Sequence, residues 1–243
     1  MYQPRTYRHW VKGDDLVDFR VAVKETDLYL RAASDLHRKA HRLVLKYRDG
    51  IEKYIARHPD FQASFEPVEV GSPAPKIVRA MADAARLCGV GPMAAVAGAI
   101  AEFVGKELLE FSPEIIVENG GDIYLKSLSR RTIGVFAGGS PLTGKLGLQI
   151  EPGDTPLGIC TSSGTVGHSL SFGKADAVIV LADSATLADA AATAIGNRVK
   201  DVADIEKGIE FAQGIGQLKG VVIIKDDKLG VWGEVKLVPT DKE

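Results

Sequence analysis

The first apolar pattern of the chain alternates with a period of two. Apolar and polar residues take turns from Leu16 to Val23, and a polar turn separates this run from a second one at Leu28–Arg31. This alternation predicts two half-buried strands that pair as a hairpin. After it, apolar residues recur at helical spacing, which predicts a helix that Ser34 caps and that ends before Pro59. We expect Gly50 to interrupt that helix.

Two further helices follow a turn-rich break. The first is predicted from Pro75 to Leu87, with Gly89 as its stop signal. The second begins near Pro92 and is small on nearly every side, with Ala94, Ala95, Ala97, Gly98, Ala99 and Ala101. Small side chains allow close approach either by another backbone or by a flat ligand. We favour the first interpretation, a tightly packed central helix.

From Glu114 onward the period changes to that of strands. Short strands are predicted at Ile115–Glu118, Ile123–Leu125, Thr132–Phe136, Lys145–Ile150, Leu157–Thr161 and within the apolar run 175–182. Helices are predicted over 184–195 and 201–213, and a last hairpin joins Val221–Ile224 to Val231–Leu237. Consecutive short strands favour antiparallel pairing, so the pattern predicts an α+β fold with mainly antiparallel or mixed sheets and packed helices. Residues 1–243 contain no repeat or long linker and are expected to form a single domain.

Composition excludes several classes of protein. The 243 residues are 45% hydrophobic, and their formal net charge of −2 gives no global attraction to nucleic acid. Cys88 and Cys160 are the only cysteines and have no metal-binding spacing, which fits a reducing compartment. The sequence contains no secretory signal pattern and no run of about 18 apolar residues. We therefore expect a cytoplasmic protein with a small-molecule or nucleotide ligand, no nucleic acid or membrane partner, and self-association as a possibility.

Two patterns resemble functional motifs but are rejected. Residues Gly139 to Lys145 have the spacing of a phosphate-binding P-loop, but Leu146 replaces its Ser or Thr and an alternating strand replaces its helix. A hairpin turn is the better interpretation. His37 and His41 stand four apart and could chelate a metal, but no acidic or cysteine partner is placed beside them. We interpret them as a solvated helix face.

Two polar sets carry candidate chemistry. The turn Asn119-Gly120-Gly121-Asp122 delivers polar groups, and its glycines would let a ligand touch the backbone, although an Asn-Gly turn needs no ligand to explain it. Asp189 and Thr193 lie four apart in an alanine-rich helix, so they share one face and could hold a hard cation such as Mg²⁺. Alternatively, Asp189 complements the helix dipole and Thr193 bonds to a carbonyl.

A loop rich in glycine and hydroxyls follows Cys160. Its candidate donors to a phosphorylated ligand are Thr161, Ser162, Ser163, Gly164, Thr165, Gly167 and His168. His168 is interpreted as a phosphate or substrate contact that could also act as an acid or base. The alternatives are hydroxyls bonded to their own backbone and a histidine satisfied by a carbonyl. A Cys160–His168 nucleophile pair is less favoured, because Cys160 ends an apolar strand.

These pieces, in this order, resemble the ApbE superfamily of FAD:protein FMN transferases. The matching segments are NGGDI (119–123), TSSG (161–164), His168 and ADAAAT (188–193). The ETDL turn at 25–28, GVGPMAAVAGAIAE and CTSSGTVGHSLSFGKADA together look like a compact cytoplasmic branch of the superfamily, and this match covers most of the chain.

The resemblance implies a fold, a ligand and a set of roles. It implies an ApbE-like fold that binds a flavin or adenine dinucleotide, as FAD or FMN, with Mg²⁺. The nucleotide would contact Asn119, Gly120, Gly121 and Asp122, and the loop 161–168 would contact phosphates. Asp189 and Thr193 would hold the metal, and Asp189 and His168 would be the catalytic residues of an FMN or nucleotidyl transfer.

The resemblance has one departure and one alternative. Flavin transferases have an H-x-x-x-P-x-T-G stretch, whereas this chain has HSLSFG at 168–173, without the proline and the threonine. Members of the compact branch have been linked with sulfur assimilation toward homocysteine in anaerobes. The alternative function is therefore an accessory protein or enzyme of sulfur assimilation that binds no flavin.

Overall fold

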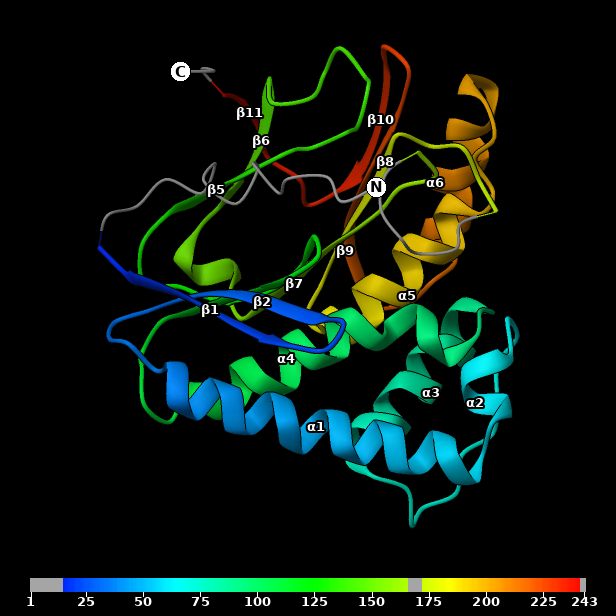
Figure 1. Cartoon of the computed structure of the whole chain (residues 1–243). Coiled ribbons are helices and arrows are strands. Elements are labelled where there is room, and N and C mark those ends of the chain that lie inside the picture. Colours follow the sequence, from blue (N-terminus) through cyan, green and yellow to red (C-terminus); the bar gives the residue numbers. More distant parts are fainter. Residues whose placement is uncertain (1–14, 166–171, 241–243) are drawn as a thin grey trace.

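An eight-stranded antiparallel sheet organises the computed structural model, which describes residues 15–165 and 172–240 (Figure 1). Its strand order is β1-β2-β3-β4-β7-β8-β9-β10, and every neighbouring pair is antiparallel. Their bounds are β1 Val17–Val23, β2 Thr26–Ala32, β3 Ile115–Asn119, β4 Asp122–Lys126, β7 Leu157–Ser162, β8 Ala177–Ala182, β9 Leu218–Lys225 and β10 Lys228–Gly233. A second sheet has the order β11-β6-β5, with β5 Arg131–Gly134, β6 Leu146–Ile150 and β11 Leu237–Pro239.

The large sheet separates two apolar cores because its strands point successive side chains to opposite faces. On one face, buried residues such as Val117, Val180 and Ile223 pack against the helices. On the other, residues such as Ile116 and Ile179 pack against the small sheet. The result is three layers, with helices on one face of the large sheet and the small sheet on the other (Figure 1).

The helical layer is built mainly from four longer helices. Their bounds are α1 His37–Arg57, α3 Lys76–Cys88, α4 Val96–Leu108 and α5 Ala185–Gly196, with the shorter α2 Asp60–Ala63 and α6 Ile205–Gln213. Single 3₁₀ turns lie at η2 Pro92–Ala95, η3 Pro152–Asp154 and η4 Val202–Asp204. In the described part of the chain no single helix is long and apolar enough to cross a membrane; α3 and η2–α4 reach that length and composition only as a pair bent by 107°.

Most predicted elements are present, including the hairpin turn in place of a P-loop. Gly89 ends α3 in the left-handed conformation with φ 68°. At the β3–β4 turn, Gly120 and Gly121 have φ of 70° and 109°. Two successive positive φ values match the twist of a two-residue hairpin, which is why an Asn-Gly-Gly sequence forms it. The loop after β5 leads into the antiparallel strand β6. These features confirm the α+β prediction.

Three local predictions were wrong. Gly50 does not interrupt α1, because packing of the apolar face outweighs the low helix propensity of one glycine. Ser34 does not cap α1; Leu36 is its N-cap residue, and Asp35 accepts the N–H of His37 at 2.8 Å. The predicted strand 231–237 is two strands in different sheets, since Gly233, with φ 86°, turns the chain out of β10 before β11 begins.

Candidate functional site

The β3–β4 turn, the end of β7, the start of α4 and the middle of α5 meet at one place. The side-chain N–H of Asn119 donates to the carbonyl of Ala97 at 3.1 Å. Asp122 Oδ1 accepts the N–H of Thr161 at 3.3 Å. Asp189 Oδ2 accepts the N–H of Gly98 at 2.8 Å. Three of the predicted polar segments are therefore brought together, although 70 residues separate Asn119 from Asp189 in the sequence.

Strand register explains why Asp122 reaches the hydroxyl-rich loop. Asp122 is the first residue of β4, and its neighbour Ile123 pairs with Ile159 of β7. In an antiparallel pair the start of one strand lies beside the end of the other, so Asp122 lies beside Cys160 and Thr161. The turn glycines that start β4 therefore also position this carboxyl group.

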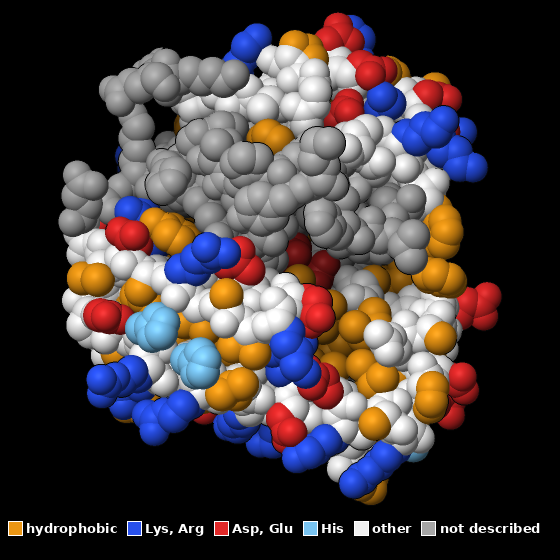
Figure 2. Space-filling view, viewed as in Figure 1, with side chains coloured by type: hydrophobic (Ala, Val, Ile, Leu, Met, Phe, Trp, Pro, Cys, Tyr) orange, Lys and Arg blue, Asp and Glu red, His pale blue; other side chains and the backbone are white. Residues whose placement is uncertain are grey.

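Three acidic side chains gather here and are called the acidic corner: Glu118, Asp122 and Asp189. Glu118 and Asp122 are only 6% and 7% exposed, and Asp189 is partly exposed. Figure 2 shows acidic side chains recessed in a hollow of the surface next to an apolar area. Glu118 accepts the N–H of Gly121 at 2.9 Å and so closes the β3–β4 turn.

Burial dominates the electrostatics of the acidic corner. It raises the pKa of Asp122 well above the ordinary value, and the negative charges of Asp189 and Glu118 raise it further. Burial also raises the pKa of Asp189 to about 7, although the N–H groups of Gly98 and Ala97 oppose that shift. No lysine or arginine is among these dominant influences within the described residues. A divalent cation would offset the repulsion between such carboxylates.

Asp189 also has a structural role that the sequence did not reveal. The start of α4 has no side-chain cap of its own, since its N-cap residue is Ala95. Asp189 supplies the missing acceptor from the neighbouring helix by bonding to the N–H groups of Gly98 and Ala97. It therefore complements the dipole of α4 rather than only that of its own helix. Thr193 is half-buried one turn further along α5.

The central helix is small because α4 and α5 are in close contact. A Cβ atom added to Gly98 would lie 2.3 Å from the carbonyl oxygen of Ala185 and 2.8 Å from Cβ of Asp189. This geometry supports the packed-helix interpretation over the flat-ligand one for Gly98.

Cys160 is buried and poorly suited to be a nucleophile. Its Sγ is 3.2 Å from the carbonyl oxygen of Ala185, to which it donates. Burial, followed by the charges of Asp122 and Asp189, raises the pKa of the Cys160 thiol well above its ordinary value. Nucleophilic cysteines need the opposite shift. His168, the other member of the rejected pair, lies outside the described residues, as does Gly167.

The loop after β7 uses several of its donors internally. The N–H of Gly164 donates to the carbonyl of Ala175 at 2.9 Å. The N–H of Thr165 donates to Ser163 Oγ at 3.1 Å, as the alternative of local hydroxyl bonding anticipated. Thr161 and Ser162, at the end of β7, remain half-buried. In this conformation the N–H groups of Gly164 and Thr165 are already bonded within the loop.

Sequence reasoning missed Glu118 and the start of α4 as parts of the site. The N-x-GGD pattern of flavin transferases places its asparagine two residues before the first glycine, and in this chain that position is Glu118, with Asn119 after it. This shift of the pattern by one residue was the sequence feature that could have identified Glu118. No sequence feature identifies the main chain of Ala97 and Gly98, because only the fold brings it to Asp189.

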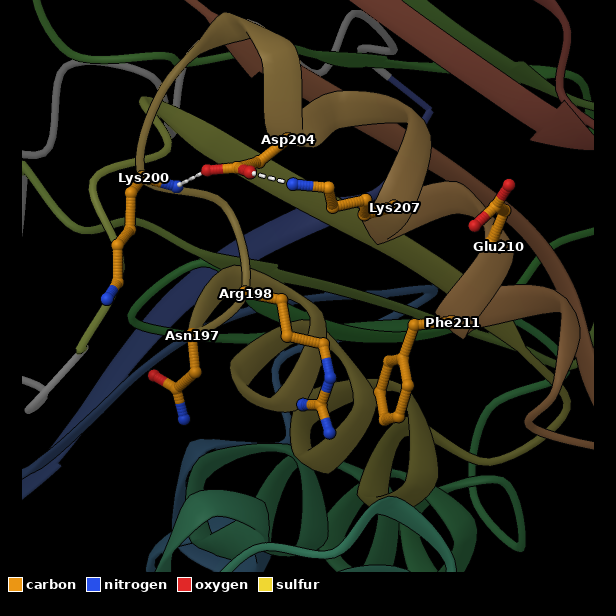
Figure 3. Close-up of a pocket in the computed structure, with 7 residues that line it drawn as sticks. All are labelled: Asn197, Arg198, Lys200, Asp204, Lys207, Glu210 and Phe211. Carbon is orange, nitrogen blue, oxygen red and sulfur yellow. Dashed lines mark hydrogen bonds and ion pairs between the residues drawn. The ribbon is translucent and has the colours of Figure 1, made fainter.

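A separate hollow of about 700 Å³ lies where α5 ends and α6 begins (Figure 3). The Arg198 guanidinium lies 3.4 Å from the centre of the Phe211 ring, and Lys207 forms an ion pair with Asp204 at 3.1 Å. The hollow is shallow and contains none of the predicted site residues, so the acidic corner remains the candidate site.

Comparison with known proteins supports the family resemblance. A family model described as AbpE bacteria matches residues 8–212. A UPF0280 protein of Methanocaldococcus jannaschii is 45% identical over 230 residues, which is 92% of this chain and 93% of that protein. A UPF0280 protein of Methanococcus aeolicus is 40% identical over 235 residues, or 94% and 95% of the two chains.

Solved structures support the fold. The ApbE protein of Thermotoga maritima has a TM-score of 0.55 at 14% identity, with 90% of this chain and 97% of that chain covered. The flavin transferase ApbE from Vibrio cholerae has a TM-score of 0.51 at 14% identity, with 89% and 96% covered. At such identity the likeness shows the ApbE fold alone. The comparisons give no support to the sulfur-assimilation alternative.

Proposed function

The chain belongs to the AbpE bacteria family, and from that premise we propose that it binds a flavin nucleotide with Mg²⁺ at the acidic corner and acts as an ApbE-like transferase. The flavin part draws on the names of structural neighbours, which are flavin transferases. The site part draws on the geometry of this chain.

The pairing of Asp122 with Asp189 is the observation that carries the proposal. Burial raises the pKa of both carboxyl groups, and the negative charge of Asp189 raises that of Asp122 further. Keeping two carboxylates charged there is costly without a cation. Carboxylate oxygens are the ligands that Mg²⁺ prefers, so the donor chemistry fits this metal.

The proposed roles follow the predicted residues. Asp189 and Thr193 would hold Mg²⁺, which when bound supplies positive charge to a phosphoryl group. Asn119, Gly120, Gly121 and Asp122 would contact the nucleotide, and Thr161, Ser162, Ser163, Gly164, Thr165, Gly167 and His168 would face the phosphates.

The chain's own groups contribute orientation and proton binding. The Asn119 amide is oriented by the carbonyl of Ala97, and the β3–β4 turn is held closed by Glu118. Burial and the negative charge of Asp189 raise the pKa of Asp122, and a cation bound beside it would lower that pKa again. Thr161 and Ser162 can offer hydroxyl donors from the end of β7.

Thermal unfolding of the full chain with FAD tests the binding proposal. We expect FAD to raise the melting temperature when Mg²⁺ is present and not when Mg²⁺ is removed by a chelator, because the cation offsets the repulsion between phosphate and carboxylates. A yellow colour on purification would agree. Absence of FAD binding at millimolar ligand, with and without Mg²⁺, would remove the proposal.

Transferase activity has its own test. Transfer of FMN from FAD to a hydroxyl breaks the pyrophosphate bond, forms a phosphoester with the acceptor oxygen and releases AMP. We expect the release of AMP, measured by chromatography, to depend on Mg²⁺ and on Asp189. FAD binding without release of AMP, or of flavin-labelled acceptor, would leave a binding protein and contradict the transferase assignment.

A further inference from the structure

Glu102 is a buried acid that the proposed site does not use. It lies on α4 with only 4% of the residue exposed, one turn beyond Gly98. A buried carboxylate needs several hydrogen-bond partners to stay charged. Its partners therefore show what the carboxylate does.

Three donors to Glu102 come from the N-cap residue and the first turn of α5. Glu102 Oε2 accepts from Ser184 Oγ at 2.7 Å, from the N–H of Thr186 at 2.9 Å and from Thr186 Oγ1 at 2.8 Å. Its other oxygen accepts from Lys106 Nζ at 2.5 Å. Burial opposes the charge on Glu102, but the hydrogen bonds from Lys106, Thr186 and Ser184 lower its pKa below the ordinary value. Glu102 thus caps α5 as a charged group.

The two helices cap each other. Glu102, on α4, binds the first turn of α5, and Asp189, on α5, binds the N–H groups at the start of α4. We call α4 and α5 with these two carboxylates the cross-capped pair. Ser184, the N-cap residue of α5, supplies the local part of the cap by accepting the N–H of Leu187.

The start of α5 has no room to shift. Its residue Ala185 lies between two glycines: a Cβ on Gly98 would be 2.3 Å from its carbonyl oxygen, and a Cβ on Gly158 would be 2.4 Å from its N and Cα atoms. These short distances mean that the backbones of Gly98 and Gly158 lie directly against the backbone of Ala185. A displaced α5 would lose this close packing. Asp189 is one turn from Ala185, and its position therefore depends on how this first turn is held.

We propose that Glu102 is a positioning residue for the candidate site: by holding the first turn of α5 against α4, it fixes where the Asp189 carboxylate stands between the start of α4 and Asp122. The role as a positioning residue rests on the proposed function. The dependence of the Asp189–Gly98 hydrogen bond on Glu102, which we call the link between the two caps, does not. Glu102 itself contacts neither ligand nor metal.

Three variants of the full chain test the inference. Glu102→Met keeps a long, unbranched side chain but removes the acceptors for α5. Glu102→Gln restores one acceptor oxygen for the N–H of Thr186. Val104→Ala is the matched control, because it removes buried volume from the same helix at a position about 200° around the axis from Glu102.

The first readout is hydrogen exchange at the start of α4, relative to the slowest core amides. We expect the amide of Gly98 to exchange at least tenfold faster in Glu102→Met, although Glu102 does not touch it, because Asp189 is released. Glu102→Gln should lie between this variant and wild type, and Val104→Ala should match wild type. Equal exchange of Gly98 in wild type and in both Glu102 variants would overturn the link. Should Glu102→Met fail to fold, Glu102→Gln carries the comparison, with at least a threefold effect expected.

The second readout is the affinity for FAD in the presence of Mg²⁺. We expect at least a tenfold loss in Glu102→Met, partial recovery in Glu102→Gln and no loss in Val104→Ala. Faster exchange at Gly98 with unchanged affinity would overturn the positioning role. Failure of the wild type to bind FAD would instead contradict the proposed function. Hydrogen exchange at Gly98 would still test the link between the caps, because that measurement does not use FAD.

Discussion

The Asp189 carboxyl group can contribute to both folding and binding, and substitutions can separate the two. Asp189→Ala removes the acceptor for Gly98, and loss of a helix cap of this kind costs about 0.5–2 kcal/mol of unfolding free energy. Asp189→Asn keeps an acceptor oxygen and should cost less. We expect both variants to lose Mg²⁺-dependent stabilisation by FAD, as measured by thermal unfolding.

The contrary outcome for Asp189 is equally clear. If Asp189 serves only to cap α4, Asp189→Ala should still lower stability by about 0.5–2 kcal/mol but should bind FAD with Mg²⁺ as wild type does. That result would remove the metal assignment and leave the cap of α4.

The pH dependence of stability offers a second prediction at the residue scale. Burial raises the pKa of Asp189 from 3.8 to about 7 in the folded chain, so the folded chain holds a proton that the unfolded chain has released. This contribution is complete below about pH 4, declines as the pH rises toward 7 and is absent above about 7. Without metal, we therefore expect stability to fall more steeply over that range in wild type than in Asp189→Asn, measured by urea unfolding. Parallel curves for the two proteins would contradict the prediction, and added Mg²⁺ should stabilise wild type most at the upper end of the range.

His168 is tested by its titration. His168→Gln keeps hydrogen bonding but removes the charge change that an imidazole undergoes near neutral pH. We expect FAD affinity of wild type to vary between about pH 5.5 and 7.5 and that of His168→Gln to vary less. A pH-independent wild type, together with wild-type binding by both His168→Gln and His168→Ala, would show that this residue has no role in the site.

At the scale of elements, two helix glycines should respond in opposite directions to the same change. Gly98→Ala places a Cβ against the backbone of α5, and overpacking of this kind costs typically 1–3 kcal/mol. Gly50→Ala, inside α1, meets Pro75 only at 3.7 Å and should stabilise by roughly 0.5–1 kcal/mol through helix propensity. Denaturant unfolding of the two variants measures the difference, and equal effects would contradict the close contact of α4 and α5.

The sequence predicted elements where the signal is local and failed where the partner is distant. The sequence Asn119-Gly120-Gly121 is enough to predict the β3–β4 hairpin, in which both glycines have positive φ. In the same way, Gly89 is enough to predict the end of α3. Glu102 and the first turn of α5, by contrast, are 82 to 84 residues apart and share no pattern. The same holds for the acidic corner: the Asn-Gly-Gly-Asp turn predicted Asp122 and the four-residue spacing to Thr193 predicted Asp189, but only the strand order and the helix packing bring the two together.

At the scale of the whole molecule, one buried cation links the small sheet to the large one. Arg131 begins β5, its side chain is 3% exposed, and it forms ion pairs with Asp15 at 2.6 Å and Glu114 at 3.1 Å. Its Nε donates to Ser127 Oγ at 2.8 Å. We expect Arg131→Met to lower the unfolding free energy by about 3–5 kcal/mol, because Glu114 is left largely buried without its cation.

Arg130→Met is the matched control for that prediction. Arg130 adjoins Arg131 but is largely exposed, and its pair with Glu151 lies on the surface. Removing it should change stability by less than about 1 kcal/mol in the same denaturant experiment. Similar losses in the two variants would mean that the buried pair does not hold the sheets together.

The small sheet has a consequence for how the chain is made. Its middle strand β6 pairs on one side with β5, which ends about a dozen residues earlier, and on the other with β11, roughly 90 residues later. A ribosome that adds about 5–20 residues per second needs on the order of 5–20 s to travel between β6 and β11. Throughout that interval one edge of β6 has no partner strand, and such an edge is open to pairing with other nascent chains. Slower initiation, which spaces ribosomes further apart on the message, should therefore raise the soluble yield of this protein.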